Sequence, residues 1–241
     1  MTDKLVKTPE AQLAATSTPT YVRVGDHRGT EHIQREDLQM PRLGLAQGLS
    51  PEIMPGDPKY IEGLAIGKMF NNLTKEIYGN GPLDFCVVRA DPPRGIEFFP
   101  LEQGGGIKDF NVPLSDPRLQ FGPNGEKPVA TKFYDFVIML LPTQELIALS
   151  FKVTGIKVAK QLNALIKMRN APLFAGKYKL SSVMTKNKSG TFAIFQVANA
   201  EWVDELTYHR AEAIYEVLKD KTIHFEREMG DEATTFDPEA L

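Results

Sequence analysis

The stretch Lys132–Val153, with the sequence KFYDFVIMLLPTQELIALSFKV, contains two apolar runs on either side of Pro142-Thr143-Gln144-Glu145. Each run is dominated by large apolar and aromatic residues and has the length of one strand, whereas the short segment between them has the composition of a turn. We therefore predict a β-hairpin in which residues 132–141 pair with residues 146–153. The other segments of the chain are placed relative to this hairpin.

A helix is predicted directly after this hairpin, over residues 154–169. Ile156, Ala159 and Ile166 recur at the spacing of one helical face, which predicts that this face is buried. Thr154 is the expected N-cap, because its hydroxyl can accept a hydrogen bond from a free N–H of the first turn. The lysines of this segment lie off the apolar face, so we expect them to be exposed.

Strands are predicted on both sides of this central unit. Residues 83–89 are expected to pair with residues 95–100 across a turn at Asp91-Pro92-Pro93-Arg94. Residues 174–184 and 191–198 are expected to form a further hairpin, because the segment between them is polar and ends in a glycine.

The last predicted element is a helix over residues 204–219. Many short antiparallel strands with an inserted helix favour a mainly β fold of the α+β class, and closure into a small barrel would remove exposed strand edges. An OB-like antiparallel barrel fits this order, and a generic α+β sandwich is the alternative. We place this domain at residues 40–227, between a flexible N-terminal arm at 1–39 and an acidic C-terminal tail at 228–241.

The net charge of −3 hides a strong segregation of charge along the chain. Residues 1–126 carry 13 Lys+Arg and 17 Asp+Glu, whereas residues 127–190 carry 11 Lys+Arg and only Asp135 and Glu145. Residues 191–241 carry 4 Lys+Arg and 12 Asp+Glu. A basic middle block followed by an acidic end indicates an anion-binding surface with an acidic tail. The alternative is a solvated lysine-rich face that binds nothing.

Single-stranded DNA binding requires cations along the phosphates and flat side chains that stack on unpaired bases, each worth about 1–3 kcal/mol. The alternation of side chains along a strand places Lys132 and Tyr134 on one face, and Lys177 and Lys179 on one face with Tyr178 opposite. We expect the lysine-bearing faces to point outward, with Tyr134 as the main stacking residue. Trp202 and Phe195 are weaker stacking candidates, and each of these aromatic residues has a core role as its alternative.

The predicted interface therefore takes in the strands, the helix and the turn of the basic block. The expected DNA-binding residues are Lys132, Tyr134, Lys152, Lys157, Lys160, Lys167, Lys177, Tyr178, Lys179, Lys186 and Lys188. Arg169 ends the predicted helix, where a cation also interacts favourably with the helix dipole. Duplex readers usually present a basic recognition helix, and because most of these cations fall on predicted strands and turns, the single-stranded mode is favoured.

We expect no catalytic site and no cofactor. The sequence contains no P-loop, and its four histidines show no metal-ligand spacing with Cys86, which is expected to be a buried, inert thiol. The main enzymatic alternative is a metal-dependent nuclease that uses Asp84, Asp91 and Glu97, and a phage structural or scaffold protein without DNA binding is a third class. A single cysteine and the lack of a long apolar run predict a cytoplasmic protein without membrane association.

Several segments resemble the OB-fold single-stranded DNA-binding proteins of bacteriophages. These are Leu146–Arg169, with its lysine-dotted strand and helix, the hairpin Phe174–Val197, and the acidic tail. The segments Pro41–Leu43 and Leu49–Glu52 also resemble the start of phage replication and recombination accessory proteins.

This resemblance implies that the protein coats single strands during DNA replication or recombination in the host cytoplasm. It also implies that the acidic tail contacts replication or recombination proteins. The sequence does not predict an oligomeric state.

Overall fold

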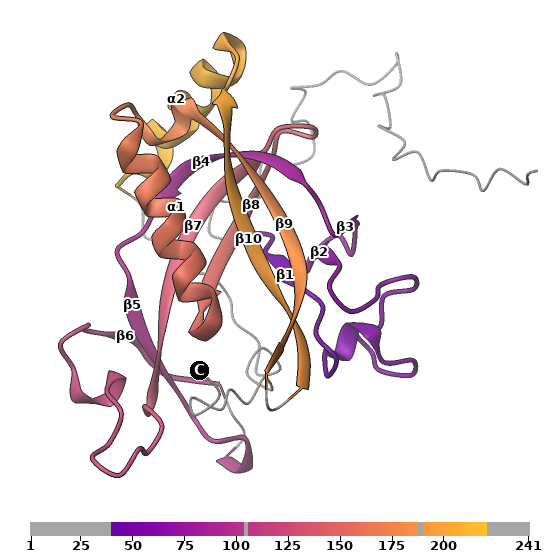
Figure 1. Ribbon diagram of the computed structural model, residues 1–241, viewed down its shortest axis with the longest axis vertical. Helices are drawn as coiled ribbons and strands as arrows, with labels where there is room; N and C mark the ends of the chain where they lie inside the picture. The colour runs from indigo at the N-terminus through magenta and orange to yellow at the C-terminus, as the bar shows by residue number, and fades with distance from the viewer. Residues whose placement is uncertain (1–39, 104–105, 188–189, 221–241) are drawn as a thin grey trace, which may run out of the picture. The chain divides into compact units, whose positions relative to one another are not determined.

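The computed structural model describes residues 40–103, 106–187 and 190–220 (Figure 1). The predicted arm at 1–39, the acidic tail at 228–241 and Lys188 lie outside the described residues.

The main element is a seven-stranded sheet in which the described strands pair antiparallel. Six strands follow the order β10-β9-β4-β7-β5-β6, and β8 pairs with β7. The strands are β4 (Leu83–Ala90), β5 (Arg94–Phe98), β6 (Ile107–Val112), β7 (Ala130–Leu140), β8 (Glu145–Lys152), β9 (Gly176–Asn187) and β10 (Gly190–Trp202). The predicted hairpins at 132–153 and 174–198 are confirmed as β7–β8 and β9–β10.

The predicted hairpin around Pro92 and Pro93 is wrong. Strands β4 and β5 do not pair with each other, and each pairs with β7 instead: Ala90 lies opposite Phe136, and Arg94 lies opposite Phe133. The two prolines have no N–H to donate to a neighbouring strand, so they interrupt the pairing along β7 between Ala90 and Arg94. The pairing of β4 and β5 with β7, and not with each other, depends on contacts between residues that are far apart in the sequence.

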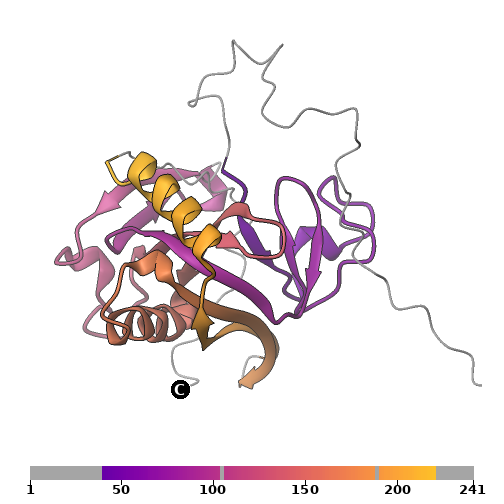
Figure 2. The same ribbon diagram turned by 90° about the horizontal axis from the view of Figure 1, so that it is seen from above.

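Two helices cover the two faces of the sheet: α1 (Ile156–Met168) and α2 (Glu205–Leu218). Alternate residues of β4 enter separate cores, because Phe85 and Val87 pack in the core with α1, whereas Cys86 and Val88 pack in the core with α2. Figure 2 shows β4 passing between the two helices. Both helices are confirmed within two residues of their predicted ends, and neither is long and apolar enough to cross a membrane.

The predicted N-cap of α1 is wrong. Thr154 lies in a 3₁₀ turn, η5 (Val153–Gly155), and Gly155 occupies the N-cap position without a side-chain hydrogen bond. At α2 the side chain of Asp204 accepts a hydrogen bond from the Thr207 N–H at 2.9 Å and caps the helix. The other short helices are η2 (Pro51–Ile53), η3 (Leu101–Gln103), η4 (Pro117–Leu119) and η6 (Leu173–Ala175).

A second, three-stranded sheet is formed by β1 (Leu43–Leu45), β2 (Met69–Asn71) and β3 (Ile77–Gly79). The segment that contains β1 contacts both β8 and β10. Arg42 forms a parallel bridge with Ala148 of β8, and the Gln47 amide exchanges two hydrogen bonds, of 2.9 and 3.0 Å, with the backbone of Ala193 in β10. The mainly β architecture with two helices is therefore confirmed, but the described strands form two open sheets rather than a closed barrel.

Candidate nucleic-acid interface

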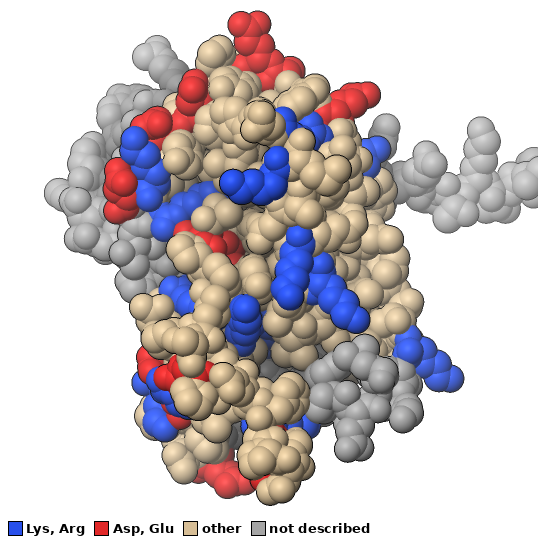
Figure 3. Space-filling view, turned by 60° about the vertical axis from the view of Figure 1, so that its left-hand side comes forward, with Lys and Arg blue, Asp and Glu red and all other residues tan. Residues whose placement is uncertain are grey.

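The outer face of α1 carries the largest group of exposed lysines from the predicted site. Lys157, Lys160 and Lys167 are all exposed, and none of them forms an ion pair with a described residue. The helix contains no Asp or Glu, and its buried residues, Val158 and Leu162 among them, point to the sheet. At 1.5 Å per residue, Lys157 and Lys167 are separated by about 15 Å along the helix axis. Figure 3, which brings the side with α1 forward, shows Lys and Arg side chains down the middle of this face.

Lys132 lies on the same face of the sheet as α1. It alternates with Phe133 and shares a face with Tyr134, which packs in the core with α1. The Lys132 ammonium is 5.3 Å from the centroid of the Tyr134 ring. Because Phe133 pairs with Lys152 just before the chain turns into α1, Lys132 lies at the end of the sheet where this helix begins.

Three of the other predicted lysines do not join this group. Lys152 lies opposite Phe133 and shares its face, with the ammonium 6.0 Å from the Phe133 ring centroid. Lys177 and Lys179 alternate with the buried Tyr178 and lie on the face of the sheet opposite to α1. The expectation of one continuous track over all the lysines is therefore wrong, because the alternation of strands β7, β8 and β9 divides them between two faces.

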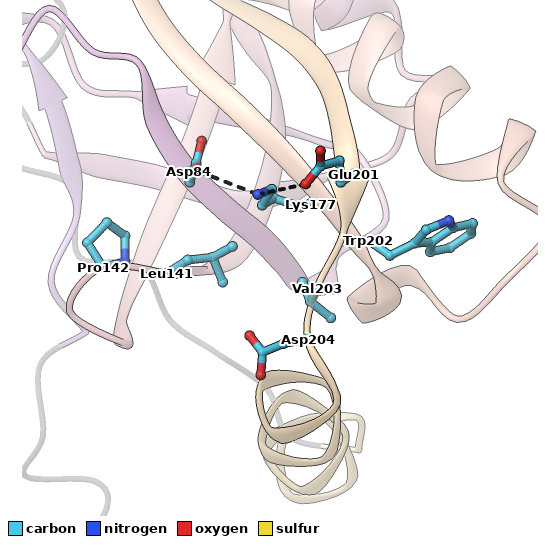
Figure 4. Close-up of a pocket in the computed structure, with 8 residues that line it drawn as sticks. All are labelled: Asp84, Leu141, Pro142, Lys177, Glu201, Trp202, Val203 and Asp204. Carbon is cyan, nitrogen blue, oxygen red and sulfur yellow. Dashed lines mark ion pairs between the residues drawn. The ribbon is translucent and has the colours of Figure 1, made fainter.

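Lys177 is also neutralised by the protein itself. Its ammonium lies 3.8 Å from the Asp84 carboxylate and 3.6 Å from that of Glu201. Figure 4 shows this lysine between the two acids at the edge of a depression of about 520 Å³. The lining residues are Asp84, Leu141, Pro142, Lys177, Glu201, Trp202, Val203 and Asp204. Three carboxylates against one ammonium make this depression unfavourable for phosphate.

Lys186, near the turn of β9–β10, is exposed.

Two aromatic residues of the predicted DNA-binding set, Tyr134 and Tyr178, are inside the core. The side chain of Tyr134 is only 8 % exposed and that of Tyr178 is 0 % exposed, so neither presents a ring face to a ligand. Phe195 is partly buried and packs edge-on against Phe151, with the ring centroids 5.8 Å apart. The alternation rule identified which residues share a face, but α1 covers the face that was expected to be open. Trp202, which is 55 % exposed, is the predicted stacking candidate that remains accessible.

Arg169 is a structural residue that the sequence did not reveal. It occupies the C-cap of α1, and its Nη2 donates to the backbone carbonyls of Ala200 at 2.7 Å and Glu201 at 2.9 Å. The guanidinium also lies over the rings of Tyr178 and Trp202, at 5.1 and 4.6 Å from their centroids. From the sequence, Arg169 is explained only by its favourable interaction with the helix dipole. No local sequence signal indicates that this arginine also fixes an irregular part of β10.

The three carboxylates of the alternative nuclease site do not come together. Asp84 pairs with Lys177, Asp91 pairs with Arg89 at 2.5 Å, and Glu97 pairs with Arg118 and Lys108. Among the described residues there is no group of three or more His, Cys, Asp or Glu side chains placed to hold a metal ion. Burial raises the pKa of the Cys86 thiol to about 12, as expected for an inert core cysteine.

These features define a mainly β domain with two helices and an uncompensated cationic helix face. The family model described as "Pam3 phage gp34-like protein" matches residues 10–224, and the chain belongs to this family of phage proteins. The bacteriophage connection drawn from the sequence is thus supported at the level of the family. Searches of curated proteins and of solved structures gave no match.

Proposed function

We propose that this phage protein binds single-stranded DNA without sequence preference and acts in phage DNA replication or recombination. The observation that carries the proposal is the outer face of α1, where Lys157, Lys160 and Lys167 are exposed and have no described carboxylate partner. Lysines are point charges that neutralise phosphates, and phosphate contacts carry no base information. The proposal does not depend on a closed OB-type barrel.

The single-stranded form is favoured over a duplex by the composition of this face. A helix that reads duplex DNA places side chains with paired donors and acceptors against base edges. On the outer face of α1 the exposed neighbours of the lysines are Ala164, Met168 and Gln161, and the amide of Gln161 already donates a hydrogen bond to the Val197 carbonyl at 3.2 Å. This face offers little for base readout in a groove, and an accessible aromatic side chain, Trp202, follows the end of the helix.

The test is a titration of fluorescently labelled oligo(dT) followed by anisotropy at several salt concentrations. If three phosphates contact the three lysines, replacing all three by Gln reduces the magnitude of the log–log salt slope by about 2 and lowers the affinity about 100-fold at 0.1 M salt. A matched control replaces Lys68, Lys75 and Lys219 by Gln, since these lysines bind carbonyls or a carboxylate of their own segments. This control has the same net charge and is expected to bind like the wild type.

Equal losses in the two triple variants would mean that only net charge matters, and the proposed interface would be wrong. Tighter binding of duplex than of single-stranded DNA would exclude the single-stranded mode. No DNA binding by the wild type at low salt, together with large assemblies in size-exclusion chromatography, would favour a structural or scaffold role.

A further inference from the structure

Trp202 is the only tryptophan of the chain, and over half of its side chain is exposed at the end of β10. Trp202 is one of the residues that line the acidic depression, and Figure 4 shows its indole pointing away from Asp84 and Lys177. A tryptophan that serves only as core packing would be largely covered by apolar neighbours. Here the described ring contact is the Arg169 guanidinium, 4.6 Å from the ring centroid.

The position of Arg169 is held by four acceptors that share the two N–H groups of its Nη2. Besides the carbonyls of Ala200 and Glu201, its Nη2 donates to the Lys177 carbonyl at 3.1 Å and to Asn199 Oδ1 at 2.7 Å. These acceptors lie where the register of β10 shifts between Asn199 and Trp202, so the irregular strand end is held to the helix by one side chain.

Close packing under Arg169 adds to this rigidity. Gly176 lies opposite Trp202 in the sheet, and a Cβ atom at this position would lie 2.9 Å from Arg169 Cδ and 2.5 Å from Tyr178 Oη. The glycine therefore leaves the space that the arginine occupies. An indole held against a fixed guanidinium is pre-organised, and a ligand that stacks on it loses little additional side-chain freedom.

The pair formed by Trp202 and Arg169 lies at the C-terminal end of the lysine row. Arg169 follows Lys167 by two residues, about 200° around the helix, so it points to the sheet and to the strand end that carries Trp202, whereas Lys167 faces outward. A strand of DNA whose phosphates run along α1 and that continues past the C-terminal end of this helix would meet the Trp202 ring with an unpaired base. Every base has an aromatic face, so such a contact is compatible with binding that does not depend on sequence.

We propose that Trp202, supported by Arg169, stacks on an unpaired base of the single-stranded DNA that lies along α1. This inference rests on the proposed function and adds a specific contact to it. Because the chain has a single tryptophan, its intrinsic fluorescence reports on this contact alone.

The first measurement uses the unmodified full-length chain. Saturating oligo(dT) is expected to quench the tryptophan fluorescence, and an oligonucleotide of the same length with abasic sites is expected to bind about tenfold more weakly and without comparable quenching. Anisotropy of a label on the DNA records binding independently of the tryptophan.

The second measurement uses variants. Trp202→Ala is expected to lower the affinity for oligo(dT) about tenfold, and Trp202→Phe is expected to retain most of it, because phenylalanine keeps a stacking surface. Phe121→Ala is the matched control, since Phe121 is also 55 % exposed but lies in the loop before β7. Circular dichroism verifies that each variant is folded.

The outcomes separate the inference from the proposed function. If oligo(dT) binds in a manner that depends on the α1 lysines, but the fluorescence is unchanged and abasic DNA binds equally well, the stacking contact is wrong and the proposed function stands. If labelled oligo(dT) does not bind at low salt, the proposed function and the inference both fall.

Discussion

The outer face of α1 and the region around β5 and β6 are both rich in charge, but the charges are arranged in opposite ways. On α1 three lysines stand without acids on their helix, whereas around β5 and β6 each charge has an opposite partner. We call this second group the β5–β6 network, and its members are Arg94, Glu97, Lys108, Asp109, Asp116, Arg118 and Asp135.

The β5–β6 network is organised around two arginines. Arg118 pairs with Glu97 at 2.6 Å, Asp109 at 2.9 Å and Asp116 at 2.8 Å, and these contacts raise the pKa of the guanidinium. Arg94 reaches the buried Asp135 at 3.3 Å. The comparison teaches that a count of cations along a sequence does not identify a binding surface, because only cations that the protein leaves uncompensated remain available to a ligand.

The largest effect is expected at Arg94. Asp135 is 2 % exposed, and besides Arg94 it accepts a hydrogen bond from the Ser150 hydroxyl at 2.6 Å. Replacing Arg94 by Met removes the cation from this buried carboxylate and should lower the free energy of unfolding by about 3 kcal/mol. Urea denaturation followed by circular dichroism measures this loss.

Lys160→Met is the matched change on the other side of the comparison. It removes a cation from an exposed helix position and should alter the free energy of unfolding by less than about 0.5 kcal/mol. A loss at Lys160 as large as that at Arg94 would show that the α1 lysines are structural.

A smaller loss of folding stability is expected when the pH is lowered. Hydrogen bonds from Lys108 and Arg118 hold the pKa of Glu97 below its ordinary value of 4.5, and contacts with Asn111 and Arg118 hold that of Asp109 below 3.8. Because folded carboxylates with lowered pKa values stabilise the native state above the unfolded pKa, this stability is lost as the pH falls below about 4.5 towards the lowered values.

Melting temperatures at pH 7 and pH 3.5 test this expectation. The wild type should melt at a lower temperature in acid, and Arg118→Gln should already be less stable at pH 7 and lose less on acidification. The triple Gln variant of the α1 lysines should keep the wild-type acid response, because none of those lysines forms an ion pair with a described carboxylate. An acid response that Arg118→Gln leaves intact would mean that other carboxylates cause it.

The smallest effect is expected at Val153, which precedes α1. Its φ of 46° lies in the left-handed region, where a β-branched residue is strained. Asn tolerates this region, so Val153→Asn should raise the free energy of unfolding by about 1 kcal/mol. Thermal denaturation measures the gain, and an unchanged affinity for oligo(dT) would indicate that the strain does not serve the α1 face. A loss of stability would mean that the exposed valine side chain contributes packing that outweighs the strain.

The elements with strong local signals were predictable from the sequence. The hairpins β7–β8 and β9–β10 and both helices lie within a few residues of their predicted positions, because apolar runs, turn residues and helical periodicity are local properties. The pairing of β4 and β5 with β7 was not predictable, since Pro92 and Pro93 suit an interruption of pairing as well as a turn, and the partner strand is about 45 residues away in the sequence.

The candidate site was predictable in its lysines more than in its aromatic residues. The α1 lysines followed from helical periodicity, which separates an apolar face from an exposed one. Strand alternation gave the pairs that share a face but not which face a helix covers, and this is why Tyr134 was misplaced. The contacts of Arg169 with Trp202 join segments more than 30 residues apart and left no local pattern.

The two hydrogen bonds between Gln47 and Ala193 have a consequence for the protein's behaviour at high copy number. A side-chain amide can both donate and accept hydrogen bonds, and here it reproduces the two-point pairing of a neighbouring backbone at one position of β10. An incoming strand from another molecule would find this position already occupied. The glutamine thus opposes pairing between β10 and a strand of another molecule at this position, and the protection matters more as the concentration of the protein rises.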